Sequence, residues 1–368
     1  MEFVLSELCD QVMTASAAHR PLHVGGGGTK AFYGNGRATQ GEPRHVLDMT
    51  AYRGVVTYEP SELVVTVRAG TPLAELEATL AEQGQMLAFE PPHFGADATV
   101  GGCVAAGLAG PRRMAAGGVR DFVLGVRLLD AQGRVLRFGG EVMKNVAGYD
   151  VSRLLAGSQG IFGALLDVSL KVVPRPIAEA TLRLQMGQAQ ALAQFGTWRG
   201  KPLPISATAW RQAEGPADSG ILTVRLSGAP AAVDGARRLL GGERMADGEA
   251  QAWWHGLREQ THPFLAQGPL WRLAVPPITP PLGLGPTLIE WGGGQRWLAG
   301  GHLSAASLRA AAAQVGGHAT LFRAGEAGMP ADGVFHPLAP AVAAITRRLK
   351  EEFDPLGIFN PGRMIPGL

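Results

Sequence analysis

Apolar residues recur along this chain with two spacings, which predict helices and strands. Near the N-terminus, positions 5, 8, 12 and 15 are apolar and stand three to four residues apart, as on one face of a helix. Residues 63–69 (LVVTVRA) form the strongest strand-like run of the first half. A helix is predicted after an N-cap at Thr71, with Pro72 as its first residue and Gly84 as its stop. Further strands are predicted at residues 22–25, 46–49, 55–58 and 164–173, and a hairpin at 122–130 and 134–138.

Pro174 and Pro176 end the last of these strands and mark a predicted domain boundary. Beyond it, strands are predicted at residues 180–186, 205–210, 221–226, 270–275, 287–291, 296–299 and 319–323, and helices at 231–240, 252–265, 303–315 and 339–353. This order is typical of an α+β domain with an antiparallel sheet and helices on one face. The predicted domains are therefore residues 1–176 and 177–336, followed by a C-terminal helix and closing segment at 337–368.

Composition places the chain among globular proteins and excludes several functions. Hydrophobic residues make up 46% of the 368 residues and charged residues 17%, which is enough apolar material for two cores. The net charge of +2 does not favour a nucleic-acid surface. No apolar run approaches about 18 residues, and the N-terminus lacks the pattern of a signal peptide, so a cytoplasmic protein is expected. Of the two cysteines, Cys103 is expected to be a small buried apolar residue.

Two glycine-rich segments carry the candidate chemistry. Residues 22–30 read LHVGGGGTK, a strand that runs into four glycines, and residues 97–113 read DATVGGCVAAGLAGPRR. Successive backbone N–H groups of such a turn form a concave nest for an anion, here a phosphate or diphosphate. The first segment does not match a phosphate-binding P-loop, because Lys precedes Ser or Thr in that motif, whereas Thr29 precedes Lys30 here. The G-x-G-x-x-G fingerprint of a Rossmann fold is also missing from both residues 25–31 and 157–163.

Together with two later segments, these residues resemble flavoproteins of the vanillyl-alcohol oxidase and p-cresol methylhydroxylase type. The four segments are residues 24–30 (VGGGGTK), 91–113 (PPHFGADATVGGCVAAGLAGPRR), 143–176 (MKNVAGYDVSRLLAGSQGIFGALLDVSLKVVPRP) and 354–364 (DPLGIFNPGRM). The last two resemble the branch of FAD-linked D-2-hydroxy acid dehydrogenases. The resemblance implies an FAD-binding domain of two α/β subdomains over residues 1–176. It also implies an α+β (ferredoxin-like) cap domain over 177–336, and a C-terminal segment that returns to the FAD domain.

The resemblance further implies which residues hold FAD. The backbone amides of Gly25–Gly28 and Thr29 are expected at the diphosphate, with Lys30 adding positive charge or simply lying exposed. Thr99, Gly101 and Gly102 are expected to bring amides to the diphosphate and the flavin ring. The remaining expected cofactor-binding residues are Pro91, Pro92, Gly107, Gly157, Gly160 and Ile161. Family members that link FAD covalently use a histidine shortly after the glycines, and because Thr29 and Lys30 stand there, non-covalent FAD is predicted.

Candidate residues for chemistry on a 2-hydroxy acid are His262, Arg272 and Arg296. Arginine suits bidentate binding of a carboxylate, although Arg272 and Arg296 each lie beside tryptophan and could instead stack at a core edge. His255 and His262 stand seven residues apart, which predicts one helical face. A helix surface is favoured there over a metal pair, and no metal site is predicted.

Chain length and residues 253–264 and 269–277 resemble a shorter FAD-binding subunit of a multi-subunit 2-hydroxy acid oxidase. This implies a larger flavin subunit and an iron–sulfur subunit as partners, and possible contact with a membrane through them. The main hypothesis is therefore oxidation of glycolate, D-lactate or a similar small 2-hydroxy acid, with electrons passed to partners. One alternative is a subunit that holds FAD for assembly or electron transfer without substrate chemistry. Another is a different reaction on the same fold, such as reduction of a nucleotide sugar.

Overall fold

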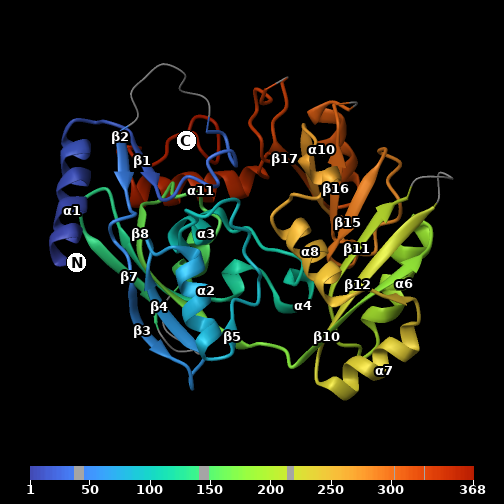
Figure 1. Ribbon diagram of the computed structural model, residues 1–368. Coiled ribbons are helices and arrows are strands. Elements are labelled where there is room, and N and C mark those ends of the chain that lie inside the picture. The colour runs from blue at the N-terminus through green and yellow to red at the C-terminus, as the bar shows by residue number, and fades with distance from the viewer. Residues whose placement is uncertain (37–44, 141–148, 214–218, 302, 327) are drawn as a thin grey trace. The chain divides into compact units, whose positions relative to one another are not determined.

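The computed structural model describes residues 1–36, 45–140, 149–213, 219–301, 303–326 and 328–368, and the chain forms two compact units (Figure 1). Unit 1 comprises Met1–Leu108, Gly118–Pro174 and Pro337–Leu368. Unit 2 comprises Ala109–Gly117 and Arg175–His336. The segment Ala109–Gly117, which was predicted to belong to the first domain, is part of unit 2.

Unit 1 contains a small parallel sheet and a larger antiparallel one. Strands β1 (Leu22–Gly25) and β2 (His45–Asp48) pair in parallel, and Phe359 adds a parallel bridge at Leu22. Helix α1 (Glu2–Ala17) covers this sheet and buries Leu8, Val12 and Ala15 against it (Figure 1). The larger sheet has five strands in the order β3-β4-β8-β6-β7, with bounds Val55–Glu59, Val64–Arg68, Ala164–Lys171, Val123–Leu129 and Val135–Gly139. The predicted hairpin is confirmed as β6 and β7.

Unit 1 contains further helices and one pair of short strands. They are α2 (Leu73–Glu82), α3 (Val100–Ala106), the 3-10 turn η1 (Val119–Asp121), α5 (Val151–Leu155), α11 (Pro340–Phe353) and the paired strands β5 (Gln85–Met86) and β9 (Val173–Pro174). The predicted N-cap of α2 is wrong by one residue, because Pro72 occupies that position. The Thr71 hydroxyl instead donates to the Arg68 carbonyl (2.7 Å) and accepts from the Gly54 amide (2.9 Å), so it ties a loop rather than a helix end.

Unit 2 contains two successive ferredoxin-like halves that share one antiparallel sheet. The first half runs β10-α6-β11-β12-α7-β13 along the chain, and its strands lie in the order β13-β10-β12-β11. The second half supplies β14-β15-β16-α10-β17 in the order β15-β16-β14-β17, which is the same arrangement reversed. The halves join where β11 pairs with β15. The predicted ferredoxin-like arrangement is therefore confirmed, but it is present twice.

The bounds of these elements are as follows. The first half comprises β10 (Ala178–Gln185), α6 (Gln188–Arg199), β11 (Ile205–Gln212), β12 (Gly220–Gly228), α7 (Pro230–Leu240) and β13 (Glu243–Arg244). Helices α8 (Asp247–Arg258) and α9 (Pro263–Ala266) connect it to the second half, which comprises β14 (Leu270–Ala274), β15 (Thr287–Glu290), the turn η2 (Trp291–Gly293), β16 (Gln295–Ala299), α10 (Ala305–Gln314) and β17 (His318–Arg323). Segment Ala109–Gly117 contributes α4 (Arg113–Ala116).

The second half has a proline-rich loop where the first half has α6. Leu282 and Leu284 of this loop pack against the core formed by β14, β16, β17 and α10, and thus replace the missing helix. Helix α6 itself was not predicted, because Gly196 and three glutamines interrupt its apolar pattern. In the structure its Leu192, Phe195 and Trp198 are nevertheless buried against the sheet.

The single helix predicted at residues 252–265 is wrong, because the structure breaks it into α8 and α9. Gln260 has a φ of 55°, and Pro263 occupies the first position of α9, where its missing N–H does no harm. His255 and His262 therefore lie on different helices. Within the described residues, no helix combines the length and the apolar character needed to cross a bilayer.

Candidate cofactor site

A turn directly after β1 presents a row of unused backbone donors. Strand β1 ends at Gly25, whose carbonyl accepts from the Met49 amide (2.9 Å). The next four amides, those of Gly26–Thr29, have no hydrogen-bond acceptor among the residues that the structure describes, and the turn closes where Ala31 donates to the Gly28 carbonyl (3.0 Å). Four successive donors with no acceptor among the described residues are the arrangement that an anion nest requires.

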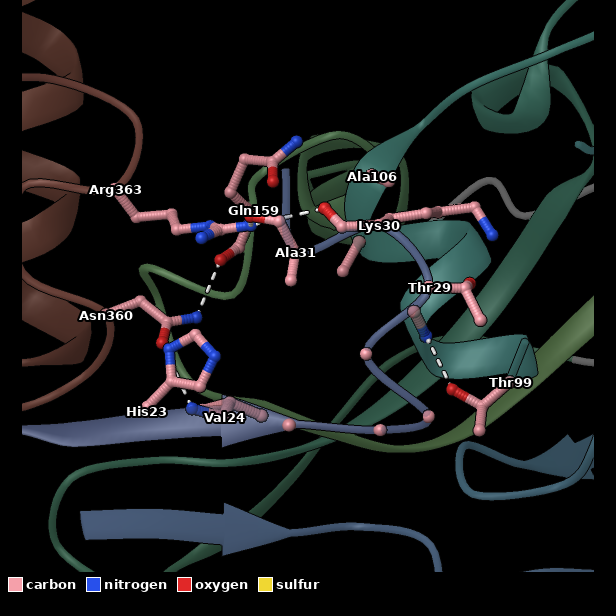
Figure 2. Close-up of a pocket in the computed structure, with 16 residues that line it drawn as sticks. His23, Val24, Thr29, Lys30, Ala31, Thr99, Ala106, Gln159, Asn360 and Arg363 are labelled. Carbon is pink, nitrogen blue, oxygen red and sulfur yellow. Dashed lines mark hydrogen bonds between the residues drawn. The ribbon is translucent and has the colours of Figure 1, made fainter. Parts of the chain in front are cut away.

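The nest is one wall of a pocket within unit 1 (Figure 2). Helix α3 forms a second wall through Gly102, Ala105 and Ala106, which share one helical face and have little or no side chain. The full lining is His23, Val24, Gly25, Gly26, Gly27, Gly28, Thr29, Lys30, Ala31, Thr99, Gly102, Ala105, Ala106, Gln159, Asn360 and Arg363. The two glycine-rich segments thus meet at one site, and small residues leave room there for a ligand with a diphosphate.

Close backbone packing explains why glycine stands at positions 26 and 27. A Cβ at Gly27 would overlap the carbonyl oxygen of Asp97, and one at Gly26 would overlap the Thr99 hydroxyl. The turn therefore lies directly on residues 97–99, just before α3. Glycine stands at position 28 for a different reason, because its φ is 71°, in the left-handed region; a Cβ there would meet no atom within 4 Å.

The amides of Gly101 and Gly102, which were expected at the ligand, donate to acceptors within the protein. The Gly101 amide donates to the Ala69 carbonyl (2.8 Å), and the Gly102 amide donates to the hydroxyl of Thr99, the N-cap of α3 (3.2 Å). Thr99 and Gly102 still line the pocket, but the free donors come from the glycine turn. Gly101 instead permits close packing, since a Cβ there would lie 2.6 Å from the Ala69 Cβ.

The other expected cofactor residues are not among those that line the described pocket. A Cβ at Gly107 would come within 2.8 Å of the Gly157 Cα, so these two glycines allow two backbone segments to touch. A Cβ at Gly160 would come within 2.8 Å of the Asn360 amide nitrogen. Pro91, Pro92 and Ile161 are buried, and none of the three is in this pocket's lining. Residues 143–148 of the third family segment lie outside the described residues.

The C-terminal segment contributes Asn360 and Arg363 to the pocket, and neither residue was predicted as a site residue. The Asn360 side chain accepts from the Val24 amide (3.0 Å) and donates to the Gln159 carbonyl (2.7 Å), so it joins two walls. Lys350 links residues that are close to Asn360 and Gln159 in the chain, because its ammonium donates to the carbonyls of Phe359 (2.8 Å) and Ile161 (2.7 Å). The closing motif DPLGIFNPGRM resembles the family's and therefore pointed to this segment, although no residue in it was assigned a role.

Lys30 lines the pocket, and its ammonium lies against the loop that contains His93 and Phe94. Its ammonium donates to the His93 carbonyl (3.2 Å) and lies 5.7 Å from the centre of the Phe94 ring. Nearby Cys103 is 2% exposed, and burial raises the pKa of its thiol to about 12, so it is the inert apolar residue that the sequence predicted.

Arg296 does not suit the predicted carboxylate clamp. Its side chain is 1% exposed, and its guanidinium donates to the carbonyls of Gly293, Pro280 and Thr279. Burial lowers the pKa of this guanidinium to about 10. Arg296 therefore anchors the proline-rich loop. Arg272, on β14, lies over the Phe322 ring at 5.6 Å and pairs in register with Thr320 and Trp297.

His262 is the N-cap of α9. Its Nδ1 accepts from the Phe264 amide (3.2 Å), and its ring meets the edge of Trp253 at 5.1 Å. Burial, followed by the charge of Arg211, lowers the pKa of His262 below its usual 6.5. His336 is similar, since its Nδ1 accepts from the Ala319 amide (3.4 Å) and burial, followed by Arg309, lowers its pKa.

These two histidines predict a loss of stability in acid. Because their pKa values are lower in the folded than in the unfolded chain, the unfolded chain binds more protons near pH 6. The free energy of unfolding should therefore be fully present above about pH 6.5 and fall as the pH drops below that value. His262→Asn keeps a capping oxygen but does not titrate, so its melting temperature should fall less than the wild type's between pH 7 and pH 5. Equal falls in thermal unfolding scans would contradict this assignment.

Comparisons with known proteins agree with this geometry. Residues 5–139 match the family model described as an FAD binding domain. A solved structure of alkyldihydroxyacetonephosphate synthase superposes with a TM-score of 0.66 at 18% identity, covering 97% of this chain and 74% of that one. The Bermuda grass isoallergen BG60 gives 0.64 at 17% identity, covering 99% and 89%. Fold and pocket together define an FAD-binding protein with the vanillyl-alcohol oxidase and p-cresol methylhydroxylase type of fold.

Curated relatives specify the family further. The glycolate oxidase subunit GlcE of Escherichia coli is 46% identical over 97% of this chain and 96% of its own length. The glycolate oxidase subunit GlcD of Bacillus subtilis is 30% identical over 50% of this chain and 38% of its own length. The chain belongs to the family of glycolate oxidase subunit GlcE.

Proposed function

We propose that this chain is the FAD-binding subunit of a glycolate oxidase-type complex. In this proposal it takes part in the oxidation of glycolate or a similar small 2-hydroxy acid, and electrons pass to partner subunits. The structural observation that carries the proposal is the row of four backbone amides at Gly26–Thr29. The substrate class comes from the full-length similarity to GlcE.

The residues present suit a dinucleotide diphosphate. The amides of the glycine turn would each donate a charge-assisted hydrogen bond to a phosphate oxygen, worth about 1.5–3 kcal/mol apiece. The small face of α3 would let the ligand approach the backbone closely. Thr29 and Lys30, and no histidine, stand directly after the glycines, so binding is proposed to be non-covalent. When bound, FAD would supply the two-electron acceptor that oxidation of a hydroxy acid requires.

The proposed partners are a larger FAD-binding subunit and an iron–sulfur subunit. Similarity to GlcD over half of this chain supports a related flavin subunit as one partner. The iron–sulfur subunit is proposed because electrons from a flavin need an onward acceptor. Contact with a membrane would come through these partners.

A second candidate function is a subunit that holds FAD for assembly or electron transfer without substrate chemistry. Two of the three candidate catalytic side chains favour it. Arg296 is committed to backbone carbonyls, and His262 to the cap of α9. Arg272 then remains as the proposed carboxylate ligand.

Anaerobic mixing with substrate separates the two functions. The purified chain, loaded with FAD, should lose its flavin absorbance near 450 nm (roughly) when glycolate or D-lactate is added without oxygen. Bleaching by the isolated chain would support substrate chemistry. Bleaching that requires the partner subunits would support the second function. A full-length folded chain with no affinity for FAD would refute both.

A further inference from the structure

Gln159, in the loop between α5 and β8, brings a carboxamide to the cofactor pocket. The residue is 8% exposed and lines the same pocket as the glycine turn. Within the part of the chain that the structure describes, its side chain has no hydrogen-bond partner. Buried side-chain amides nearly always have one, because a donor or acceptor that loses water without gaining a partner destabilises the protein. A ligand in the pocket would supply the missing partner.

Backbone contacts fix the position of Gln159. Its amide donates to the Ala105 carbonyl of α3 (2.9 Å), and its carbonyl accepts from the side chain of Asn360 (2.7 Å). Figure 2 shows its carboxamide directed away from Asn360, on the opposite side of the pocket from Thr99. Since both contacts use the main chain, the residue is held in place while its carboxamide stays available to a ligand.

The backbone at Gln159 has a conformation that favours glycine. Its φ is 56°, in the left-handed region, and two glycines of the same loop, Gly157 and Gly160, have φ values of 86° and 70°. A residue with a side chain is strained at such a φ, and glycine would avoid that cost. Residues strained in this way cluster at ligand sites. A glutamine at this position therefore indicates a use for its side chain.

We propose that the Gln159 carboxamide hydrogen-bonds the adenosine part of the bound flavin dinucleotide, through a ribose hydroxyl or the edge of adenine, and so makes the pocket select FAD over FMN. The inference rests on the proposed function, because it presumes that FAD occupies this pocket. A carboxamide both donates and accepts, which matches a hydroxyl or the adenine edge. The glycine turn, by contrast, offers only donors, which match the diphosphate.

The adenosine half of FAD is favoured over the flavin half by the place of the pocket in the fold. The flavin ring has to be within reach of a substrate and an electron acceptor, whereas adenosine only has to be held. The pocket is lined entirely by residues of unit 1, and its polar residues Gln159, Asn360 and Thr99 are 8%, 6% and 6% exposed. A wall of buried residues within one unit suits the half of the cofactor that does not react.

Binding of three nucleotides to the full-length chain tests the proposal. ADP carries the adenosine and the diphosphate, whereas FMN carries the flavin and one phosphate. Gln159→Met keeps the length of the side chain and removes its donor and acceptor. It should raise the dissociation constants of FAD and ADP about tenfold each, and it should leave that of FMN unchanged.

Two further variants separate a ligand contact from a structural role. Gln159→Gly removes the same carboxamide and suits the φ of 56°, so it should melt close to the wild type without FAD and still bind FAD and ADP about tenfold more weakly. This variant keeps the test decisive if Gln159→Met folds poorly. Gln83→Met replaces an exposed glutamine of unit 1 outside the pocket lining, and it should leave all three dissociation constants unchanged.

The outcomes distinguish the proposal from the function on which it rests. Equal losses of ADP and FMN affinity would show that Gln159 only shapes the loop, and a loss for FMN alone would place it at the flavin. Either result would overturn the proposal, as would three unchanged dissociation constants. A wild-type chain that binds no FAD would instead refute the proposed function.

Discussion

The Gly28→Asp variant is expected to fold like the wild type and to bind FAD about a hundredfold more weakly. Gly28 lies in the middle of the nest, and a Cβ at this position would meet no atom within 4 Å. An aspartate there would place a negative charge beside the diphosphate. Two like charges about 5 Å apart repel by about 3 kcal/mol at an effective dielectric constant near 20, which corresponds to a hundredfold or more in affinity.

Gly28→Asn is the matched control. Asparagine has the same shape as aspartate, and both tolerate the left-handed conformation that the φ of 71° requires, at a cost of about 1 kcal/mol. The two variants should therefore melt at the same temperature, and the difference in their FAD dissociation constants would report the charge. Equal affinities in a fluorescence titration would show that no anionic group binds at this turn.

Gly27 and Gly101 are poorer positions for the same test. A Cβ at Gly27 would overlap the Asp97 carbonyl, and one at Gly101 would lie 2.6 Å from Ala69 Cβ. A bulky residue at either position would disturb the backbone itself, and loss of FAD would then say little about binding. A substitution at Gly28 therefore tests FAD binding more directly than one at Gly27 or Gly101, because a side chain there does not disturb the backbone.

Local patterns predicted the longer strands and most of the longer helices correctly, because each is specified by its own apolar spacing. The hairpin β6–β7 and the strand β4 are examples. The short elements α3, α4, α5, β5 and β13 were not predicted. Helix α6 was missed because tertiary burial of Phe195 and Trp198 outweighs a weak local pattern. The break between α8 and α9 was missed because α8 ends at Arg258 and His262 caps the start of a new helix, although the apolar pattern runs on. The duplicated ferredoxin-like arrangement depends on strand order, which no local spacing records.

At the cofactor site, the glycine turn could be predicted because four consecutive glycines have few uses other than close approach of the backbone. The direction of each N–H could not, and so Gly101 and Gly102 were expected at the ligand although their amides bond within the protein. Asn360 and Arg363 are more than 300 positions from the turn that they support. Only the folded chain brings them together.

Lys350→Met should destabilise unit 1 by about 3–5 kcal/mol, the range for removing one partner of a buried ion pair. Lys350 and Asp354 are 4% and 1% exposed, and the ammonium lies 2.5 Å from the carboxylate. Burial lowers the pKa of Lys350 even though Asp354 opposes that shift, so the pair depends on its remaining hydrogen bonds. The Asp354 carboxylate also accepts from the amides of Ile358 (3.0 Å) and Phe359 (2.7 Å), just before Asn360.

Loss of Lys350 leaves the buried carboxylate without its cation and frees the carbonyls of Ile161 and Phe359. Urea unfolding followed by release of FAD fluorescence would measure the change in unit 1. The double variant Lys350→Met/Asp354→Asn has no buried charge left and should be more stable than Lys350→Met alone, because the amide oxygen still accepts from the turn. Arg347→Met, on the exposed face of α11, should change stability by less than about 0.5 kcal/mol. If Lys350→Met lowered the free energy of unfolding no more than Arg347→Met, the C-terminal segment would not stabilise the cofactor pocket. The pocket would then have to be held in shape by β1 and α3.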